Sequence, residues 1–276
     1  MIEKIKIKVL KSIESLGFER KVLVNAKILD KNFLVRKGTI RNKPDKDDAW
    51  LFELSKKSKT IFDVGSNIGQ SSILMSYNNP EKIILIDPNP RALCVAAENI
   101  ILNNISQKTI FYNCFVGENS GEIIDFYTVG LGAAGSKFKS FAKSANRIGS
   151  HFKVKTKTID EISKETKITP ELIKIDVEGA ESEVLIGSTS LARKQITKFF
   201  VEVHSGAELS ITENTSKILK WCNENNYKAI YLKTMNNLNI ENISKRGRYH
   251  ALLMPENENI PNNLSKIKEG DKINYS

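Results

Sequence analysis

The feature that most constrains the fold is a regular alternation of short apolar runs and helical patterns, which begins at residue 60. The apolar runs are continuous rather than alternating, and they cover residues 60–65, 82–87, 109–114, 172–177 and 198–204. Strands without a polar side are typical of a parallel sheet that is covered on both faces. Helical patterns at 68–77, 90–103 and 180–192 separate the runs. The alternation predicts an α/β fold with a doubly wound parallel sheet.

The two ends of the chain lie outside this alternation. Residues 1–18 predict a short amphipathic helix rather than a signal peptide, because Lys and Glu interrupt the apolar positions. Residues 21–40 suggest a hairpin that turns near residues 30–32. The resulting domain prediction is an N-terminal extension at 1–50, a main domain at 51–256 and a loosely packed polar tail at 257–276.

One segment in the middle of the chain has no clear period. Residues 129–152 are rich in Gly, Ala and Ser, and they lie between strand-like runs at 121–128 and 153–159. Long irregular loops inside compact domains usually carry function. We therefore expect residues 129–152 to act as a lid or a substrate-binding loop.

The first apolar run ends in a glycine-rich turn, DVGSNIG, at residues 63–69. Glycine after a strand adopts backbone angles closed to other residues and lets a ligand approach the main chain. The helix that follows presents free N–H groups and a positive dipole end, which suit a carboxylate or a phosphate. The spacing fits neither the G-x-G-x-x-G of a dinucleotide site nor a P-loop. It is similar to the D-x-G-x-x-x-G turn of doubly wound methyltransferases that use S-adenosylmethionine.

A carboxylate ends the next apolar run. Asp87, in the sequence IDPNP, would lie beside the glycine turn if the two strands are neighbours. There it would accept hydrogen bonds from both ribose hydroxyls of a nucleoside. Taken alone, Asp87 is better explained as the start of a turn with Pro88 that caps the helix beginning near Pro90. Taken with the glycine turn, it favours a cofactor that contains a nucleoside.

Several segments, in order along the chain, resemble the FkbM family of methyltransferases. They span residues 50–205 and read IFDVGSNIGQSS, IDPNPRALCVAAENIILNN, YNCFVGENSGEIIDFY, KTIDEI and ELIKIDVEGAESEVLIGSTSLARKQITKFFVEVHS. The resemblance implies an S-adenosylmethionine-dependent O-methyltransferase that acts on a hydroxyl of a sugar or natural product. It also implies the mostly parallel, seven-stranded, Rossmann-like sheet of class I methyltransferases. Strand-like runs at 228–234 and 249–254 would supply its last two strands, after a helix near 214–226.

The resemblance and the glycine turn together assign a cofactor site. Four residues of the turn would hold the amino-acid end of S-adenosylmethionine, one carboxylate its ribose, and one amide its adenine edge. In that order, the expected cofactor-binding residues are Asp63, Gly65, Asn67, Gly69, Asp87 and Asn113.

Methyl transfer to a neutral alcohol requires a base or a metal to deal with the alcohol's proton. In an open parallel sheet such groups lie past the carboxyl ends of the strands. Asp176 and Glu178 follow one apolar run, and His204 ends another. His204, with an ordinary pKa of about 6.5, is the expected base. Asp176 would orient it, the substrate or a metal. We assign no metal ligands, although a divalent ion is compatible with these side chains.

Two of the apolar runs contain charged residues two positions before these site residues. They are Lys174, before Asp176, and Glu202, before His204. If the two strands are neighbours in register, Lys174 lies beside Glu202 and Asp176 beside His204. A buried Lys and a buried Glu are costly unless they pair. The pattern therefore predicts a salt bridge between Lys174 and Glu202 beneath the active site.

Composition limits the choice of partner and compartment. The 276 residues carry a net charge of +10, but the Lys residues are spread along the chain without interleaved aromatic residues. The net charge is the only support for the alternative of an RNA ribose 2′-O-methyltransferase. A catalytically silent cofactor-binding protein is a further alternative. The three scattered cysteines form no C-x-x-C pair, which argues against a zinc site. No apolar run approaches a membrane-spanning length. We expect a cytoplasmic enzyme with a small-molecule or glycan acceptor.

Overall fold

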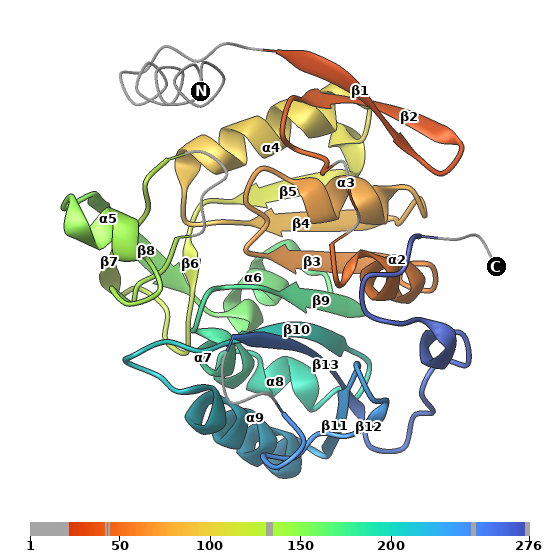
Figure 1. The fold of residues 1–276 in the computed structure, drawn as a ribbon, viewed down its shortest axis with the longest axis vertical. Helices are drawn as coiled ribbons and strands as arrows, with labels where there is room; N and C mark the ends of the chain where they lie inside the picture. Colours follow the sequence, from red (N-terminus) through yellow and green to blue (C-terminus); the bar gives the residue numbers. More distant parts are fainter. Residues whose placement is uncertain (1–21, 42, 44, 131–134, 244–246, 274–276) are drawn as a thin grey trace, which may run out of the picture.

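The computed structural model of the chain describes residues 22–41, 43, 45–130, 135–243 and 247–273, so the helix expected at 1–18 lies outside the described residues. Its centre is an eight-stranded sheet (Figure 1). In chain order, the strands are β3 (Thr60–Val64), β4 (Lys82–Ile86), β5 (Thr109–Tyr112), β9 (Leu172–Ile175), β10 (Lys198–His204), β11 (Tyr227–Tyr231), β12 (Asn236–Asn237) and β13 (Arg248–Pro255).

The sheet is mixed, and its spatial order is β12-β11-β13-β10-β9-β3-β4-β5. The strands from β10 to β5 run parallel to one another, whereas β13 pairs antiparallel with both β10 and β11. The prediction of an α/β fold is therefore confirmed, but the sheet is mixed rather than wholly parallel, because β13 runs against its two neighbours. The expected number of seven strands is wrong, because the two-residue strand β12 adds an eighth at the edge.

Helices cover both faces of the sheet, as the continuous apolar strands require. Neighbouring residues of β3 point to opposite sides: Ile61 belongs to one hydrophobic core and Phe62 to the other. The core around Ile61 contains residues of α2 (Asp48–Ser55), α3 (Gln70–Ser76) and α4 (Pro90–Leu102). The core around Phe62 contains residues of α6 (Ile159–Thr166), α7 (Glu181–Ile186), α8 (Thr189–Ala192) and α9 (Ile211–Asn225).

A second, smaller sheet stands beside the first and contains the strands that flank the irregular segment. It has the order β6-β8-β7, with β6 at Phe115–Val116, β7 at Ile123–Tyr127 and β8 at His151–Lys157. The segment between β7 and β8 is not without structure, because it forms a bridge from Tyr127 to Ser136 and the short helix α5 (Lys143–Arg147). It lies on the left of Figure 1, where the β3 and β4 arrows end.

The two ends of the described chain also pack on the domain. The expected hairpin is present, with β1 at Leu23–Ile28 and β2 at Lys31–Arg36. The polar tail is packed rather than loose, because Leu264 is fully buried and the Trp50 indole donates a hydrogen bond to the Ile267 carbonyl. Apolar residues spaced along a polar segment were the signal for this packing.

The register between β9 and β10 differs by two residues from the expected one. Lys174 pairs with Phe200 rather than with Glu202, so the predicted salt bridge between Lys174 and Glu202 is wrong. Lys174 is instead the direct neighbour of Asp63 on β3. Its Nζ lies 3.6 Å from Asp63 Oδ1 and 3.2 Å from Asp176 Oδ2. The buried ammonium is still paired, but with Asp63 on the other neighbouring strand and with Asp176 just past the end of β9 itself.

Lys174→Met should lower the free energy of unfolding by about 3–5 kcal/mol, because it leaves the fully buried Asp63 without its cation. Urea denaturation at neutral pH measures this loss. Lys153→Met is the matched control, because the Lys153 side chain is 75% exposed, and its effect should stay within about 0.5 kcal/mol. Equal effects of the two substitutions would contradict the structural role of Lys174.

Candidate active site

The glycine turn after β3 is built into the space between β4 and β9. The amide groups of Gly65 and Ser66 both donate to the Ile86 carbonyl at the end of β4. Gly65 has a φ of 79°, and a Cβ atom there would lie 1.9 Å from the Asp176 carbonyl oxygen. Only glycine fits this close approach, which places the turn directly beside the residues that follow β9.

Two of the predicted cofactor residues support the turn from below. Asp63 is fully buried, and its Oδ2 accepts hydrogen bonds from the hydroxyls of Ser71 and Ser72 at the start of α3. Gly69, with a φ of 86°, packs against Ala96 of α4. Neither residue lines the cavity above the turn. They fix the shape of the turn and the closeness of α3 to α4.

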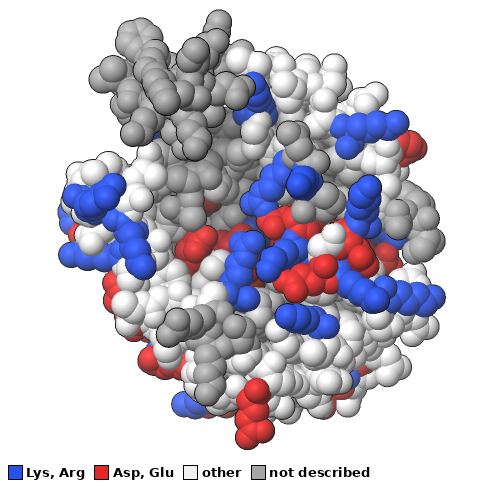
Figure 2. Space-filling model, in the orientation of Figure 1, with Lys and Arg blue, Asp and Glu red and all other residues white. Residues whose placement is uncertain are grey.

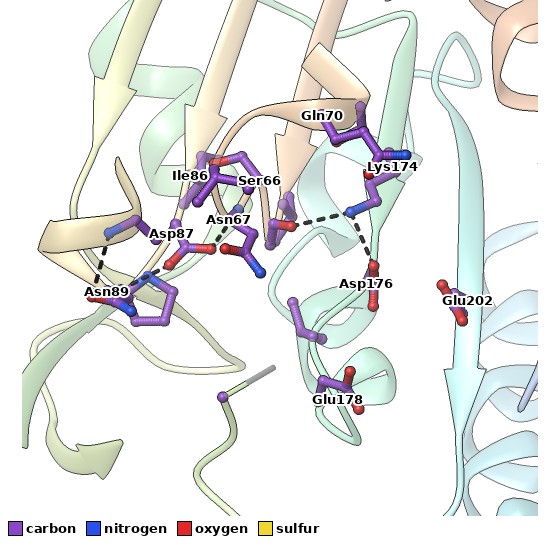
Figure 3. A pocket seen from close by; sticks show the side chains of 18 of the residues that line it. Ser66, Asn67, Gln70, Ile86, Asp87, Asn89, Lys174, Asp176, Glu178 and Glu202 are labelled. Atoms are coloured by element: carbon purple, nitrogen blue, oxygen red, sulfur yellow. Dashed lines mark hydrogen bonds and ion pairs between the residues drawn. The ribbon is translucent and has the colours of Figure 1, made fainter. Parts of the chain in front are cut away.

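A cavity of about 270 Å³ opens where the parallel strands end (Figure 3). Gly65, Ser66, Asn67 and Asp87 line one side of it. Ser66 Oγ and Asn67 Oδ1 are buried and have no hydrogen-bond partner among the residues that the structure describes. Buried polar atoms normally have partners, so these two point to a ligand at the turn.

Asp87 faces the same cavity from the end of β4. Its Oδ2 accepts a hydrogen bond from the Asn67 amide and its Oδ1 one from the Asn89 amide, each at 2.8 Å. Burial raises the pKa of Asp87 to about 6, although these amide donors favour the charged form. Asn89, not Asp87, caps α4. Asp87 therefore takes part in the turn expected there, but it does not cap the helix.

Asn113 does not line the cavity. Its side-chain nitrogen donates to the carbonyls of Asp87 and Pro88, both at 3.0 Å, and so ties the end of β5 to the turn after β4. The lining beyond this turn is mainly apolar, and it consists of Pro88, Cys114, Phe115, Val116 and Phe126. This end of the cavity suits a flat apolar group.

The other end of the cavity is acidic. In Figure 3, Asp176, Glu178 and Glu202 lie to the right of the glycine turn, with Glu202 projecting from its own strand, β10. In Figure 2, Asp and Glu form a band across the middle of the visible face, bordered by Lys and Arg. The acidic lining residues of the cavity are Asp45, Asp47, Asp48, Asp87, Asp176, Glu178 and Glu202. A chain with a net charge of +10 thus keeps a negatively charged cavity.

His204 lies where this acidic end meets a second hollow, which it lines together with Glu178. Its Nδ1 is 2.9 Å from Oε1 of the fully buried Glu181, whose other oxygen accepts from Asn214. Its Nε2 lies within 3.8 Å of carboxylate oxygens of Asp176, Glu178 and Glu202. The three predicted catalytic residues are therefore close together.

Sequence reasoning missed Glu181 and Asn214. From the sequence, Glu181 has a simpler explanation as a favourable charge in the first turn of a helix, which is where α7 places it. Asn214 lies in α9, far along the chain, and no motif marks it. Only the packing of α7 against α9 brings both side chains to His204.

The surroundings of His204 and Glu178 raise the pKa of both groups, for different reasons. Burial alone would lower the pKa of His204, but Glu181, Glu202 and Asp176 outweigh it and raise that pKa to about 12. Burial also raises the pKa of Glu178, to about 7, against the pull of the His204 charge. These shifts favour the charged form of His204 near neutrality, and they move the titration of Glu178 toward neutral pH.

The segment between β7 and β8 packs on this end of the site. Phe141 touches the backbone of Gly179, which follows Glu178, and of Gly206, which follows β10; a Cβ at either glycine would lie within 2.6 Å of the Phe141 ring. The Ser136 hydroxyl donates to the Glu178 carbonyl at 2.8 Å. Both contacts hold the turn that carries Glu178.

Residues 63–229 match the Methyltransferase FkbM domain, and this span contains the glycine turn, Asp87 and the cluster around His204. The chain belongs to the FkbM methyltransferase family. The chain is 28% identical over 159 residues to the hexuronic acid methyltransferase AglP of Haloferax volcanii. The match covers 57% of this chain and 61% of AglP, so it spans less than two thirds of that relative.

Solved structures of similar fold are distant in sequence. The FkbM methyltransferase of Methylobacillus flagellatus is 17% identical, with a TM-score of 0.46, and the match covers 71% of this chain and 43% of that one. TYW2 of Pyrococcus horikoshii, solved in complex with MeSAdo, is 15% identical, with a TM-score of 0.46 and coverages of 91% and 83%. Among the described residues of the chain, none of the helices has the length and apolar character of a membrane span.

Glu181→Gln should lower the pKa of His204 by at least about one unit, because it removes the buried carboxylate bound to Nδ1. NMR titration of the His204 ring in the wild type and the variant measures the shift. Glu208→Gln is the control. Glu208 accepts a hydrogen bond from the backbone amide of Ser140, and it is not among the described hydrogen-bond or ion-pair partners of His204. A wild-type His204 that titrates near 6.5 would show that the carboxylates do not hold it charged.

Proposed function

We propose that this FkbM methyltransferase transfers a methyl group from S-adenosylmethionine to a hydroxyl oxygen of a sugar. The observation that carries the proposal is the continuity of one cavity, which runs from the glycine turn and Asp87 to Asp176, Glu178 and Glu202. One end offers the groups that suit a nucleoside-containing cofactor. The other offers a proton acceptor and a fixed cation, His204, at its border.

The residues present fit the cofactor. The free polar atoms of Ser66 and Asn67 would meet its amino-acid end, above the support supplied by Asp63 and Gly69. Asp87 would accept from its ribose hydroxyls. Its adenine would lie along the apolar lining near Phe115, and Asn113, which does not line the cavity, would only brace the turn after β4. In this proposal, residues 51–256 form a class I methyltransferase domain, and β12 is an addition to the seven strands of that fold.

The chemistry divides among three side chains. When bound, S-adenosylmethionine supplies an electrophilic methyl group. Glu178 would accept the proton of the acceptor hydroxyl, since its pKa of about 7 lets it be a base near neutrality and yet hold a proton well. His204 would hold Glu178 in place and donate a hydrogen bond to an acceptor oxygen. Asp176 would accept from a second hydroxyl. This changes the expected roles, because the pKa of His204 is too high for a base.

The acceptor class rests on the relative and on the border of the cavity. AglP is named for hexuronic acid, a sugar. Arg248 and Glu178 line both the main cavity and the second hollow, which also includes Phe141 and Ser140 from the β7–β8 segment. We propose that a saccharide enters across this hollow and that the β7–β8 segment closes over it as a lid.

The direct test is transfer of radiolabelled methyl from S-adenosylmethionine to saccharides. Panels of uronic acids, neutral sugars and RNA oligonucleotides should be compared with the same enzyme. Labelling of a saccharide at a hydroxyl oxygen, identified by mass spectrometry after base treatment that cleaves esters, is expected. Labelling of RNA alone would replace the proposal with the ribose 2′-O alternative, and cofactor binding without any transfer would favour a catalytically silent protein.

Asp87→Ala should weaken binding of S-adenosylmethionine and of its demethylated product by about 1–3 kcal/mol, because the ribose hydroxyls lose their acceptor. Wild-type affinity should also fall as the pH drops below about 6, where Asp87 takes up a proton. Isothermal titration calorimetry measures both effects. Asp125→Ala is the control, because Asp125 lies on β7 of the smaller, three-stranded sheet. Unchanged affinity in Asp87→Ala would remove Asp87 from the site.

Glu178→Gln should reduce kcat by about 10²–10⁴-fold and leave cofactor affinity unchanged, because it removes the proton acceptor only. The wild-type rate should rise with pH up to about 7 and then level off, since the deprotonated carboxylate is the active form. Steady-state rates across pH measure this. Glu208→Gln provides a carboxylate control at the border of the site. A Glu178→Gln enzyme with the wild-type pH profile would assign the base elsewhere.

A further inference from the structure

A second cluster of titratable side chains lies at the β13 side of the cavity. Glu202 on β10 and His250 on β13 are direct partners in the antiparallel register. Asp47, the residue before α2, reaches the same place. One ligand atom from each of the three lies within 4.8 Å of the others. Asp47 and Glu202 line the cavity, so the cluster is next to space that a ligand can enter.

The ring of His250 is buried and aimed at the two carboxylates. Only 3% of the residue is exposed, and its Nε2 has no hydrogen-bond partner in the described part of the chain. Nε2 lies 3.6 Å from Glu202 Oε2 and 3.9 Å from Asp47 Oδ2, beyond hydrogen-bond range. The ring is held by stacking on Phe200 and by contact with Trp50. A buried nitrogen so placed is costly unless something lies between it and the carboxylates.

Asp47 is positioned as a helix cap but does not act as one. It occupies the N-cap position of α2, yet its side chain makes no capping hydrogen bond. An Asp at this position normally accepts from an amide of the first turn, which stabilises the helix by about 1 kcal/mol. Here the carboxylate turns toward His250 instead. The Asp47 side chain therefore contributes to the cluster with His250 and not to the capping of α2.

The nearby cations are engaged with other atoms. Arg248 Nη1 lies 2.6 Å from Glu202 Oε1, the oxygen that does not face His250. Lys174 is placed between Asp63 and Asp176. Among the residues that the structure describes, no Lys or Arg forms an ion pair with Asp47 Oδ2 or Glu202 Oε2, the two oxygens that face the His250 nitrogen.

We propose that Asp47, Glu202 and His250 bind a divalent transition-metal ion, of the class of Mn²⁺ or Zn²⁺. Metal bonds of about 2.0–2.2 Å set neighbouring ligand atoms roughly 3–3.5 Å apart, so small side-chain movements would close the cluster around an ion. Two carboxylate oxygens and one imidazole nitrogen suit these ions, whereas Mg²⁺ prefers oxygen alone. Three protein ligands leave coordination positions open toward the cavity for water or an acceptor hydroxyl. Binding of the ion does not depend on the proposed methyl transfer.

The test uses the full chain, stripped with EDTA, returned to chelator-free buffer and titrated with MnCl₂ or ZnCl₂ alone. Calorimetry and metal analysis by mass spectrometry should give one ion per chain. His250→Phe, which keeps an aromatic ring against Phe200 and Trp50, should weaken binding at least about tenfold. Asp47→Asn should do the same while preserving shape, which keeps the test valid if the first variant folds poorly.

His151→Phe is the matched control. His151 is also a His beside a carboxylate, that of Asp125, but it is half-exposed and lies on the smaller, three-stranded sheet. It should leave affinity unchanged. No binding of either ion would overturn the proposal, as would equal loss in all variants. Binding that survives His250→Phe and Asp47→Asn but is lost in His204→Gln would also overturn it, and would place the ion at the alternative group of Asp176, Glu202 and His204.

Discussion

The buried ammonium of Lys174 is the interaction on which the site depends. It lies at the centre of the sheet, near Asp63 on one neighbouring strand and Asp176 at the end of its own. It also donates to the Gly65 carbonyl at 3.1 Å. Burial alone would lower the pKa of Lys174, but the surrounding carboxylates raise it, so the cation persists. The Lys174 ammonium thus links Asp63 beneath the glycine turn, Gly65 in the turn and Asp176 at the acidic end of the cavity.

At the acidic end of the cavity, the fold places four carboxylates around a single imidazole ring. His204 is surrounded by carboxylates of Asp176, Glu178, Glu181 and Glu202. These acids keep His204 protonated, and its charge in turn limits the rise in the pKa of Glu178. The assignment of acid and base is therefore a property of the cluster, not of either residue alone.

Glu202 connects the proposed catalytic groups with the proposed ion site. Its Oε1 lies 3.5 Å from His204 and its Oε2 3.6 Å from His250. The two neighbouring imidazole rings hold the pKa of Glu202 low despite its burial, so it stays a carboxylate. An ion beside it would add positive charge near the acceptor oxygen, where negative charge develops as the proton leaves. The two proposals are thus compatible but separately testable.

Much of this protein follows from local sequence. Continuous apolar runs predict buried strands, and a glycine with positive φ predicts the turn, because these depend on burial and backbone sterics alone. Hence the parallel core, the hairpin and the places of Gly65 and Asp87 could be predicted. The register of β9 against β10 could not, because the sequence offers Lys174 a carboxylate on either neighbouring strand, Asp63 or Glu202, and only the structure shows that Asp63 is the partner. Nor could the environment of His204, since Glu181 and Asn214 reach it only through packing of α7 on α9. Protonation depends on such distant neighbours, so the proposal that Glu178 is the base comes from the tertiary structure alone.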